Sequence, residues 1–303
     1  MTDNAADRHG AVVGIDGSAG SLAALDWAIG HADSLGTIRP ITAWDYPAIA
    51  WLPAPLSVAA VPPEAEMQSA AEDAATAYDL MLADVASEPP VVTRGIAAEV
   101  LLEASNDAKA IVIGTRGHGP VLDSLLGSVG RRVADRTTVP LVIVPDGNDT
   151  NTDPPAPERP SATPLAERIL VGVDGSPAAT DALAWAIEFA KPEDEIIALT
   201  SWTTPVTVGM DVPRFDVNAL RAEATNTVKA AVAKVCSEVG VPEDRITCQI
   251  AEGDPRWVLK EMEDDVDLLV VGSRGHTGIS HLILGSTTTS LIHSPRCPVV
   301  VVP

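Results

Sequence analysis

The sequence predicts an α/β protein of two tandem domains, each a doubly wound fold with a five-stranded parallel sheet covered by helices on both faces. Three observations predict it. The length of 303 residues suits two domains of ordinary size. The second half repeats the motifs of the first half 158 positions later, for example from Gly114 to Gly272. Short apolar runs alternate with helical patterns, which is typical of parallel strands joined by right-handed crossovers.

A stretch rich in proline and small polar residues separates the two halves. Residues 147–164 show no apolar periodicity. This composition predicts a solvated, semi-extended linker. The two domains are therefore expected at residues 9–146 and 165–303.

Strands are expected at short apolar runs, which suit a sheet buried on both faces. In the first half these runs are Ala11–Ile15, Ile38–Trp44, Val91–Ile96, Ala110–Ile113 and Pro140–Val144. The second half repeats this order and ends with strands at Leu268–Val271 and Pro298–Val302.

Helices are expected where apolar residues recur at helical spacing. Leu22, Leu25 and Ile29 give this pattern within Ser21–Leu35, and Ser18 or Ser21 is the candidate cap. The other helices of the first half are expected at residues 64–86, 97–106 and 121–136.

Both halves carry Gly-x-x-Gly, nine further residues and then Gly-Ser, from Gly114 to Ser128 and from Gly272 to Ser286. The motif follows the fourth strand, where glycines let the backbone turn tightly and approach a ligand without a β-carbon in the way. Successive N–H groups favour a phosphate, as do the first N–H groups of the helix that Gly127 begins or precedes. The alternative is that these glycines serve only to close the loop.

An aspartate follows the first strand of each half, at Asp16 and Asp174. In doubly wound sheets, ligands bind outside the carboxyl ends of the strands, and a carboxylate there accepts from a ribose hydroxyl or holds a metal near phosphates. The alternative is an Asx-turn or helix cap within Asp-Gly-Ser. Neighbouring positions that would face or border a nucleoside are Gly14, Gly172, Ala43, Ser201, Trp44 and Trp202. The alternative for the two tryptophans is a place in the core.

The glycine loops also carry Arg116 with His118, and Arg274 with His276, which would contact phosphate or lie exposed. The chain has no Walker P-loop, no Gly-x-Gly-x-x-Gly fingerprint and no Gly-x-Ser-x-Gly elbow. No group stands out as a general base for hydrolysis, so no catalytic residue is assigned.

The formal net charge of −22 argues against binding to nucleic acid or to anionic membranes, because both repel such a surface. The three cysteines form no spaced pair, which suits a reducing compartment. No secretory signal and no apolar run long enough to cross a bilayer is visible. We therefore expect a cytoplasmic protein that is not inserted into a membrane.

The motifs Val-Gly-Ile-Asp-Gly-Ser and Val-Gly-Val-Asp-Gly-Ser, together with the glycine motif in both halves, resemble the ATP-binding branch of the universal stress protein family. The chain is similar to a tandem two-domain member of the type found in actinobacteria. The resemblance covers all but the N-terminal tail and the linker. It implies a strand order 3-2-1-4-5 and ATP, with Mg²⁺, at the carboxyl edge of each sheet, so that one chain holds up to two ATP molecules.

Members of this family commonly pair through the fifth strand, here Leu141–Val144 and Val299–Val302. This pairing implies a pseudo-twofold relation between the two domains, or a homodimer.

The motifs and the resemblance together give the candidate nucleotide-binding residues. In the first half they are Gly14, Ile15, Asp16, Ala43, Gly114, Thr115, Arg116, Gly117, His118, Gly119, Gly127, Ser128 and Val129. In the second half they are Gly172, Val173, Asp174, Ser201, Gly272, Ser273, Arg274, Gly275, His276, Thr277, Gly278, Gly285, Ser286 and Thr287. Thr287 stands where the first half has Val129, and Ser201 where it has Ala43, so the two sites are expected to differ in affinity.

The leading functional hypothesis is an ATP-binding regulatory protein that signals stress through its conformation or through an unidentified protein partner. One alternative is a slow ATPase or an enzyme that phosphorylates itself at Ser128 or Ser286. Another is an interaction scaffold that does not respond to nucleotide. AMP and cyclic AMP are alternative ligands, although two phosphate-facing glycine elements favour a polyphosphate.

Overall fold

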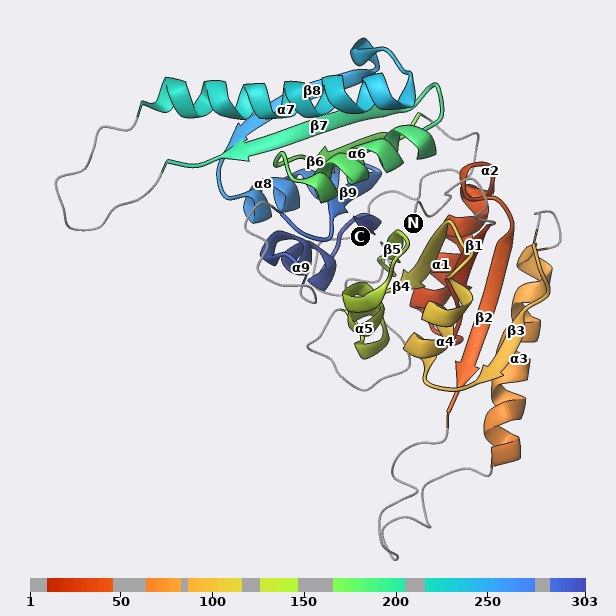
Figure 1. Cartoon of the computed structure of the whole chain (residues 1–303). Helices are drawn as coiled ribbons and strands as arrows, with labels where there is room; N and C mark the ends of the chain where they lie inside the picture. Colours follow the sequence, from red (N-terminus) through yellow and green to blue (C-terminus); the bar gives the residue numbers. More distant parts are fainter. Residues whose placement is uncertain are drawn as a thin grey trace, which may run out of the picture. The chain divides into compact units, whose positions relative to one another are not determined.

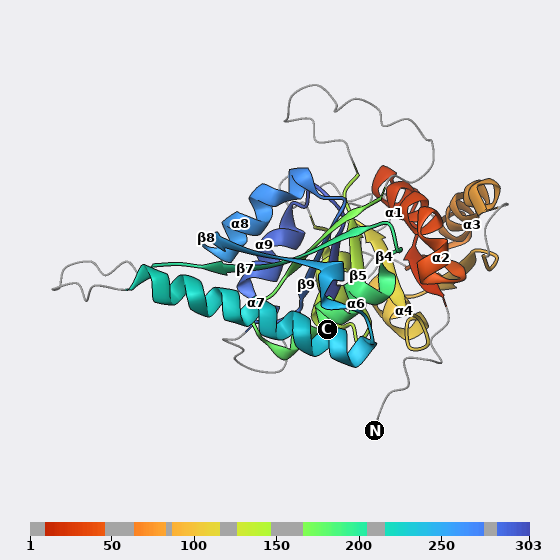
Figure 2. The same ribbon diagram turned by 90° about the horizontal axis from the view of Figure 1, so that it is seen from above.

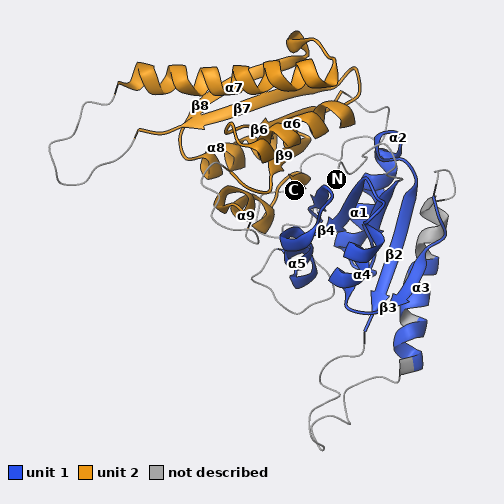
Figure 3. Ribbon diagram, viewed as in Figure 1, with its two compact units in different colours: residues 1–146 blue, residues 147–303 orange. Residues whose placement is uncertain are grey.

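The computed structural model divides into two compact units, Met1–Asp146 and Gly147–Pro303 (Figure 3). The residues that the structure describes are 10–45, 64–82, 87–115, 126–146, 166–204, 216–275 and 284–303. The predicted linker, residues 147–164, lies outside them. Each unit is described below by itself.

The sheet of unit 1 has the order β3-β2-β1-β4-β5, and its neighbouring strands are parallel. Its strands are β1 (Ala11–Gly14), β2 (Ile38–Trp44), β3 (Val91–Arg94), β4 (Ala110–Gly114) and β5 (Leu141–Val144). The sheet of unit 2 has the order β8-β7-β6-β9-β10 and is also parallel. Its strands are β6 (Arg168–Gly172), β7 (Glu195–Trp202), β8 (Ile246–Glu252), β9 (Leu268–Gly272) and β10 (Val299–Val302). Both sheets confirm the predicted order 3-2-1-4-5.

Helices cover the sheet of unit 1 (Figure 1). They are α1 (Ala19–Gly30), α2 (Ala32–Leu35), α3 (Glu64–Leu82), α4 (Ala97–Ala104) and α5 (Ser128–Arg136). Helix α1 packs on β1, β4 and β5, and α3 packs on β2 and β3. Helix α4 packs on β1 and β2 and contacts α5, which lies on β5.

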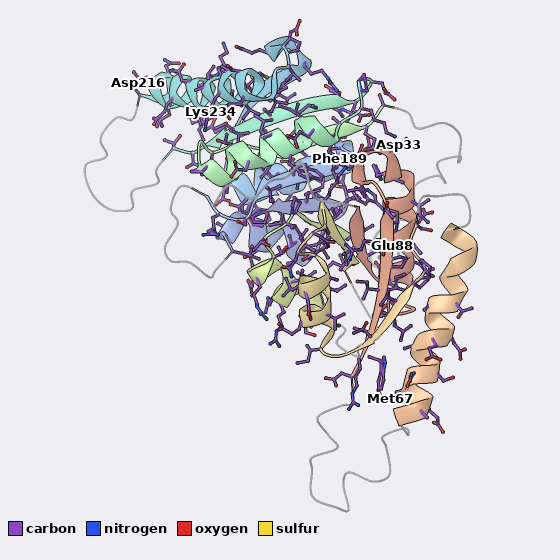
Figure 4. The ribbon with its side chains drawn as sticks, turned by 45° about the vertical axis from the view of Figure 1, so that its right-hand side comes forward. Asp33, Met67, Glu88, Phe189, Asp216 and Lys234 are labelled. Carbon is purple, nitrogen blue, oxygen red and sulfur yellow. The ribbon has the colours of Figure 1, made fainter. Side chains whose placement is uncertain are left out.

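Among the described residues, unit 2 has counterparts of α1, α3, α4 and α5 but not of α2, and Figure 2 shows α8 and α9 on the opposite side of its strands from α7. Its helices are α6 (Pro177–Phe189), α7 (Val217–Val239), α8 (Pro255–Met262) and α9 (Ser286–His293), with short 3₁₀ turns η3 (Glu243–Arg245) and η4 (Glu263–Asp265). Asp216, labelled in Figure 4, is the N-cap of α7. Its carboxylate accepts from the N–H groups of Asn218 at 2.9 Å and Ala219 at 3.2 Å. An aspartate in this position satisfies N–H groups that have no partner within the helix.

The cores are aliphatic. Fully buried side chains include Leu25, Ile111 and Leu141 in unit 1, and Ile169 and Leu268 in unit 2. The inner strands, such as β4 and β9, are buried along most of their length because helices lie on both faces of each sheet, whereas the edge strands β3 and β8 are only partly buried.

Three predicted helices begin or end elsewhere than expected, and the helix predicted at residues 97–106 ends at Ala104. The helix predicted at Ser21–Leu35 is interrupted at His31, whose Nδ1 lies 2.7 Å from the Trp27 carbonyl oxygen and whose ring stacks on Trp27 at 4.2 Å. The helix predicted at residues 121–136 begins at Ser128. Residues 121–125 lie outside the described part of the chain, and Leu126 and Gly127 are not helical.

Candidate functional site

A cavity of about 340 Å³ opens in unit 2 at the carboxyl ends of β6, β7 and β9. Its lining comes from the ends of these strands, from the first turn of α8 and from the first turn of α9. The crevice therefore lies where doubly wound sheets bind their ligands.

The cavity brings together most of the described candidate residues of unit 2, which are distant in sequence. These lining residues are Gly172, Val173, Asp174, Ser201, Gly272, Arg274, Gly275, Gly285, Ser286 and Thr287. Ser273 does not line it: the side chain is buried, and its Oγ has no hydrogen-bond partner among the described residues. His276, Thr277 and Gly278 lie outside the described residues.

The Asp-Gly-Ser turn forms the Asx-turn that was the alternative interpretation of its aspartate. Asp174 Oδ1 accepts from the Ser176 N–H at 2.9 Å, and Asp16 Oδ1 accepts from the Ser18 N–H at 3.0 Å. The two serines cap the following helices through their hydroxyl oxygens. Because Asp174 also lines the cavity, the turn and the site use the same carboxylate.

The first glycine of each glycine motif is required by packing against a helix. A β-carbon on Gly272 would lie 2.6 Å from the carbonyl carbon of Ala178 in α6. On Gly114 it would lie 2.3 Å from the carbonyl carbon of Gly20 in α1. No side chain fits there, because backbone atoms of a packed helix cannot move aside. These two glycines let the helix approach the strand end closely.

The second and third glycines of unit 2 are required by different neighbours. A β-carbon on Gly275 would lie 2.6 Å from Asp174 Oδ2, so this glycine makes room for the carboxylate. A β-carbon on Gly285 would meet nothing closer than the Ser273 carbonyl oxygen at 3.5 Å. Neither the backbone conformation of Gly285, with φ −60°, nor its described protein neighbours demand glycine. The space beside it is open to the cavity.

Gly285 is the N-cap of α9, so the cavity faces the start of a helix. Ser286, Thr287 and Thr288 form the first turn and line the cavity. The first N–H groups of a helix have no acceptor within it and carry a partial positive charge, which favours an anion. Ser286 and Thr287 add hydroxyl groups, and Arg274, whose Cα lies 3.6 Å from the β-carbon position of Gly285, adds a cation to the lining.

The cavity has several lining residues that the sequence analysis missed as nucleotide contacts. They are Ala179, Leu199, Thr203, Gly253, Pro255, Leu259, Val271 and Thr288. Trp202, one of the two tryptophans expected to border a nucleoside, also lines the cavity. A signal for Gly253 was present, since Gly95 stands 158 positions earlier, and both have positive φ, 145° and 152°.

Asp254 lies between two lining residues, yet its carboxylate is engaged elsewhere. It caps α8 through the Arg256 N–H at 2.9 Å and pairs with the Arg256 guanidinium at 2.7 Å. The hydrogen bond from Arg256 lowers the pKa of Asp254. Asp174 is therefore the acidic group that faces the cavity among the described residues.

Unit 1 places its described candidate residues on equivalent elements. Gly14, Ile15 and Asp16 lie at and after the end of β1, Ala43 lies in β2, and Gly114 and Thr115 lie at and after the end of β4. Gly127 caps α5, whose first residues are Ser128 and Val129. Arg116, Gly117, His118 and Gly119 lie outside the described residues.

The described residues hold neither a membrane-spanning helix nor a cluster of metal-binding side chains. No helix there is both long enough and apolar enough to cross a membrane. In the same part of the chain, no group of three or more His, Cys, Asp or Glu side chains is placed to hold a metal ion.

The chain is similar to known proteins along nearly its whole length. Residues 9–145 and 166–303 each match the model of the universal stress protein family. A universal stress protein of Mycobacterium tuberculosis strain H37Rv is 29% identical over 309 residues, covering 97% of each chain. One from Mycolicibacterium smegmatis is 28% identical over 310 residues, covering 98% of each.

The fold is similar to that of solved structures. The crystal structure of a universal stress protein from Archaeoglobus fulgidus gives a TM-score of 0.62 at 20% identity and covers 96% of this chain and 97% of that one. A putative universal stress protein from Pseudomonas aeruginosa gives a TM-score of 0.58 at 12% identity, covering 99% and 94%.

Proposed function

The chain belongs to the universal stress protein family as a tandem two-domain member, and on that premise we propose that it is an ATP-binding regulatory protein of the stress response. In this proposal each unit holds one nucleotide at the carboxyl edge of its sheet. Occupancy changes the conformation around the site, which an unidentified protein partner then recognises. Free cysteines in the described chain suit a reducing compartment, and we place the protein in the cytoplasm.

The cavity of unit 2 carries the proposal. Its volume of about 340 Å³ lies in the range of small-ligand sites. It joins the Asp-Gly-Ser turn to the glycine motif, although Asp174 and Gly272 are far apart in sequence. A loop-closing role alone does not require glycine at position 285, because a β-carbon there would make only ordinary van der Waals contact, at 3.5 Å from the Ser273 carbonyl oxygen.

The lining fits a nucleoside polyphosphate. The start of α9, with Ser286 and Thr287, would hold phosphate oxygens, and Arg274 would add a charge-assisted contact. Trp202 offers an aromatic surface for the base, and Leu199 and Leu259 add apolar contacts. When bound, ATP supplies the negative charge that draws these donors toward one another.

Mg²⁺ would come with the nucleotide. Mg²⁺ in nucleotide sites usually keeps several waters and is bound by one or two carboxylates plus substrate phosphates. Asp174 would supply the carboxylate of this set. The absence of a larger ligand cluster among the described residues fits such a shared site.

Hydrogen–deuterium exchange tests the regulatory part of this function. We expect MgATP to slow exchange in peptides that contain residues 172–179, 201–204 and 284–291, and to leave α7 unchanged. A titration that binds ATP without any change in exchange would contradict signalling through conformation. Acid release and mass spectrometry of nucleotide from freshly purified protein would identify the resident ligand among ATP, AMP and cyclic AMP.

A further inference from the structure

The proposed function puts the base of the nucleotide at the end of the site formed by Trp202 and Gly253, which we call the base end. The backbone there makes the same hydrogen bond in both units. The Gly253 N–H donates to the Trp202 carbonyl oxygen at 2.9 Å, and the Gly95 N–H donates to the Trp44 carbonyl oxygen at 2.8 Å. The ends of β7 and β2 are therefore held alike. Residues 158 positions apart occupy equivalent places in space, and their side chains can be compared directly.

The phosphate end is also the same in both units. The Gly285 N–H donates to the Ser273 carbonyl oxygen at 2.8 Å, and the Gly127 N–H donates to the Thr115 carbonyl oxygen at 2.9 Å. The two capping glycines have φ −60° and −62°. Helices α9 and α5 thus begin in the same geometry, with equivalent N–H groups free of helical acceptors.

The side chains on this shared frame differ where they would meet phosphate. Thr287, the second residue of α9, lines the cavity of unit 2. The equivalent residue of α5 is Val129, which has the same branched shape and no hydroxyl. Unit 1 therefore lacks one hydrogen-bond donor at its phosphate end, and such donors bind charged acceptors most strongly.

The base end differs as well. Trp202 lines the cavity of unit 2, whereas the guanidinium carbon of Arg94 lies over the Trp44 ring of unit 1, 5.4 Å from its centroid. Unit 2 has Glu252 where unit 1 has Arg94. A base could stack on Trp202 in unit 2, whereas in unit 1 the Arg94 cation already lies over the equivalent ring of Trp44.

The charges near the base end oppose the two differences above, which both favour binding in unit 2. Unit 1 has Asp45 where unit 2 has Thr203, which lines the cavity. Asp45 and Arg94 carry opposite charges, and Glu252 gives unit 2 a negative charge at the end of β8. The net charge of these positions therefore favours anion binding slightly in unit 1. The hydroxyl of Thr287 and the Trp202 ring in the cavity lining favour unit 2.

We infer that the two sites are unequal, that unit 2 is the tighter site for a nucleoside polyphosphate, and that Thr287 is the residue that sets most of the difference. This inference rests on the proposed function, since it ranks two sites for the same class of ligand. One charged hydrogen bond corresponds to a difference in Kd of about tenfold.

The experiment isolates each site in the full chain. Ser128→Asp places a carboxylate where phosphate would bind in unit 1, so only the site of unit 2 can bind ATP. Ser286→Asp blocks unit 2 in the same way, so only the site of unit 1 can bind ATP. A carboxylate at the first position of a helix favours the helix, so the fold should be kept. Equilibrium dialysis with radiolabelled ATP and excess Mg²⁺ then gives one Kd for each unit.

The isosteric exchange tests Thr287 itself. We expect Thr287→Val to lower the ATP affinity of the Ser128→Asp protein about tenfold. Val129→Thr should raise the ATP affinity of the Ser286→Asp protein by a similar factor. Equal affinities in the two single-site proteins, a tighter unit 1, or no response to either exchange would overturn the inference. If the unaltered protein binds no ATP, the proposed function itself fails, which is a different result from two equal sites.

Discussion

Asp174 and Gly275 are matched to one another in unit 2. Asp174 Oδ2 lies 2.6 Å from where a β-carbon on Gly275 would stand, while Oδ1 of the same carboxylate accepts from the Ser176 N–H at 2.9 Å. The glycine motif thus leaves the space that the carboxylate of the Asp-Gly-Ser turn occupies. Two motifs that lie about a hundred residues apart form one structure, which explains why both recur together in each half of the chain.

Gly275→Ala should lower ATP affinity by displacing the Asp174 carboxylate. We expect a loss of about tenfold, the size of one charged hydrogen bond. A double-mutant cycle with Asp174→Ala separates this cause from a direct contact between Gly275 and the ligand. If Gly275 acts through Asp174, Gly275→Ala has no further effect once Asp174 is gone. Additive losses would show that the glycine contributes on its own.

Gly272→Ala should destabilise the fold, whereas Gly285→Ala should leave the stability of the fold nearly unchanged. The first places a β-carbon against the backbone of Ala178, so we expect a loss of about 1–3 kcal/mol in the free energy of unfolding. The second has room for the methyl group and should cost under about 1 kcal/mol. Urea unfolding and ATP titration of both variants check this. Equal destabilisation would contradict the packing role of Gly272.

The fold was predictable from the sequence because its signals are local. Apolar runs gave the strands, and the strand order came with the resemblance to a family. The helix break at His31 was not predictable, because it depends on a ring stacked on Trp27 and a bond to its carbonyl oxygen. The role of Gly272 was predicted only in part. Its position in a motif indicated a ligand, whereas its neighbour in space is helix α6.

The three cysteines should differ sharply in reactivity. Desolvation raises the pKa of all three thiols, and that of Cys297 to about 12, but only Cys248 is exposed to a reagent, while Cys236 and Cys297 are buried. Since the thiolate is the reactive form, we expect about one fast-reacting thiol per chain with Ellman's reagent near pH 8. Cys248→Ser should remove the fast phase, and urea should expose all the remaining thiols. A fast phase that survives in Cys248→Ser would contradict the burial of the other two.

Glu263 is a buried carboxylate at the far end of α8 from the cavity. Its side chain is 0% exposed, and Oε2 accepts from Lys260 Nζ and from the Arg296 N–H, both at 2.9 Å. Lys260 Nζ also donates to the Ser294 carbonyl oxygen at the end of α9. Glu263 therefore helps to join the two helices whose first turns line the cavity. Unit 1 has Ser105 at this position and ties α4 to α5 through Glu99 and Arg132 instead.

Glu263→Gln should change how stability depends on pH. Burial raises the pKa of Glu263 above its ordinary value, despite the pairing with Lys260. The folded state therefore binds the proton more readily than the unfolded state. The stability that Glu263 contributes is present below the ordinary carboxyl pKa and is lost as pH rises through the raised folded value.

Urea unfolding of both proteins, from about pH 4 to about pH 8, checks the sign of this effect. The free energy of unfolding of the unaltered protein, relative to Glu263→Gln, should fall as pH rises. A difference that grows with pH would mean that Lys260 and Arg296 outweigh burial.

The candidate site was predictable where its residues belong to repeated motifs. Asp174, Gly275, Gly285 and Ser286 stand at the same offset from their counterparts and do line one cavity. Leu199 and Leu259 were not predictable as lining residues, because an aliphatic residue at a strand end or in a helix has the same pattern whether it faces a cavity or the core. Only the packing of α8 against the sheet brings Leu259 to the site.

Isothermal titration of the full chain with ATP and excess Mg²⁺ measures whether both units hold ATP. We predict about two sites per chain, about one in each of Ser128→Asp and Ser286→Asp, and no binding when the two changes are combined. Ser290→Asp is the matched control, since it adds the same charge to α9 at an exposed position outside the cavity lining. It should bind ATP as the unaltered protein does. Unchanged stoichiometry in the combined variant would mean that ATP binds elsewhere than at the starts of α5 and α9, and no heat of binding in the unaltered protein would mean that neither unit holds ATP.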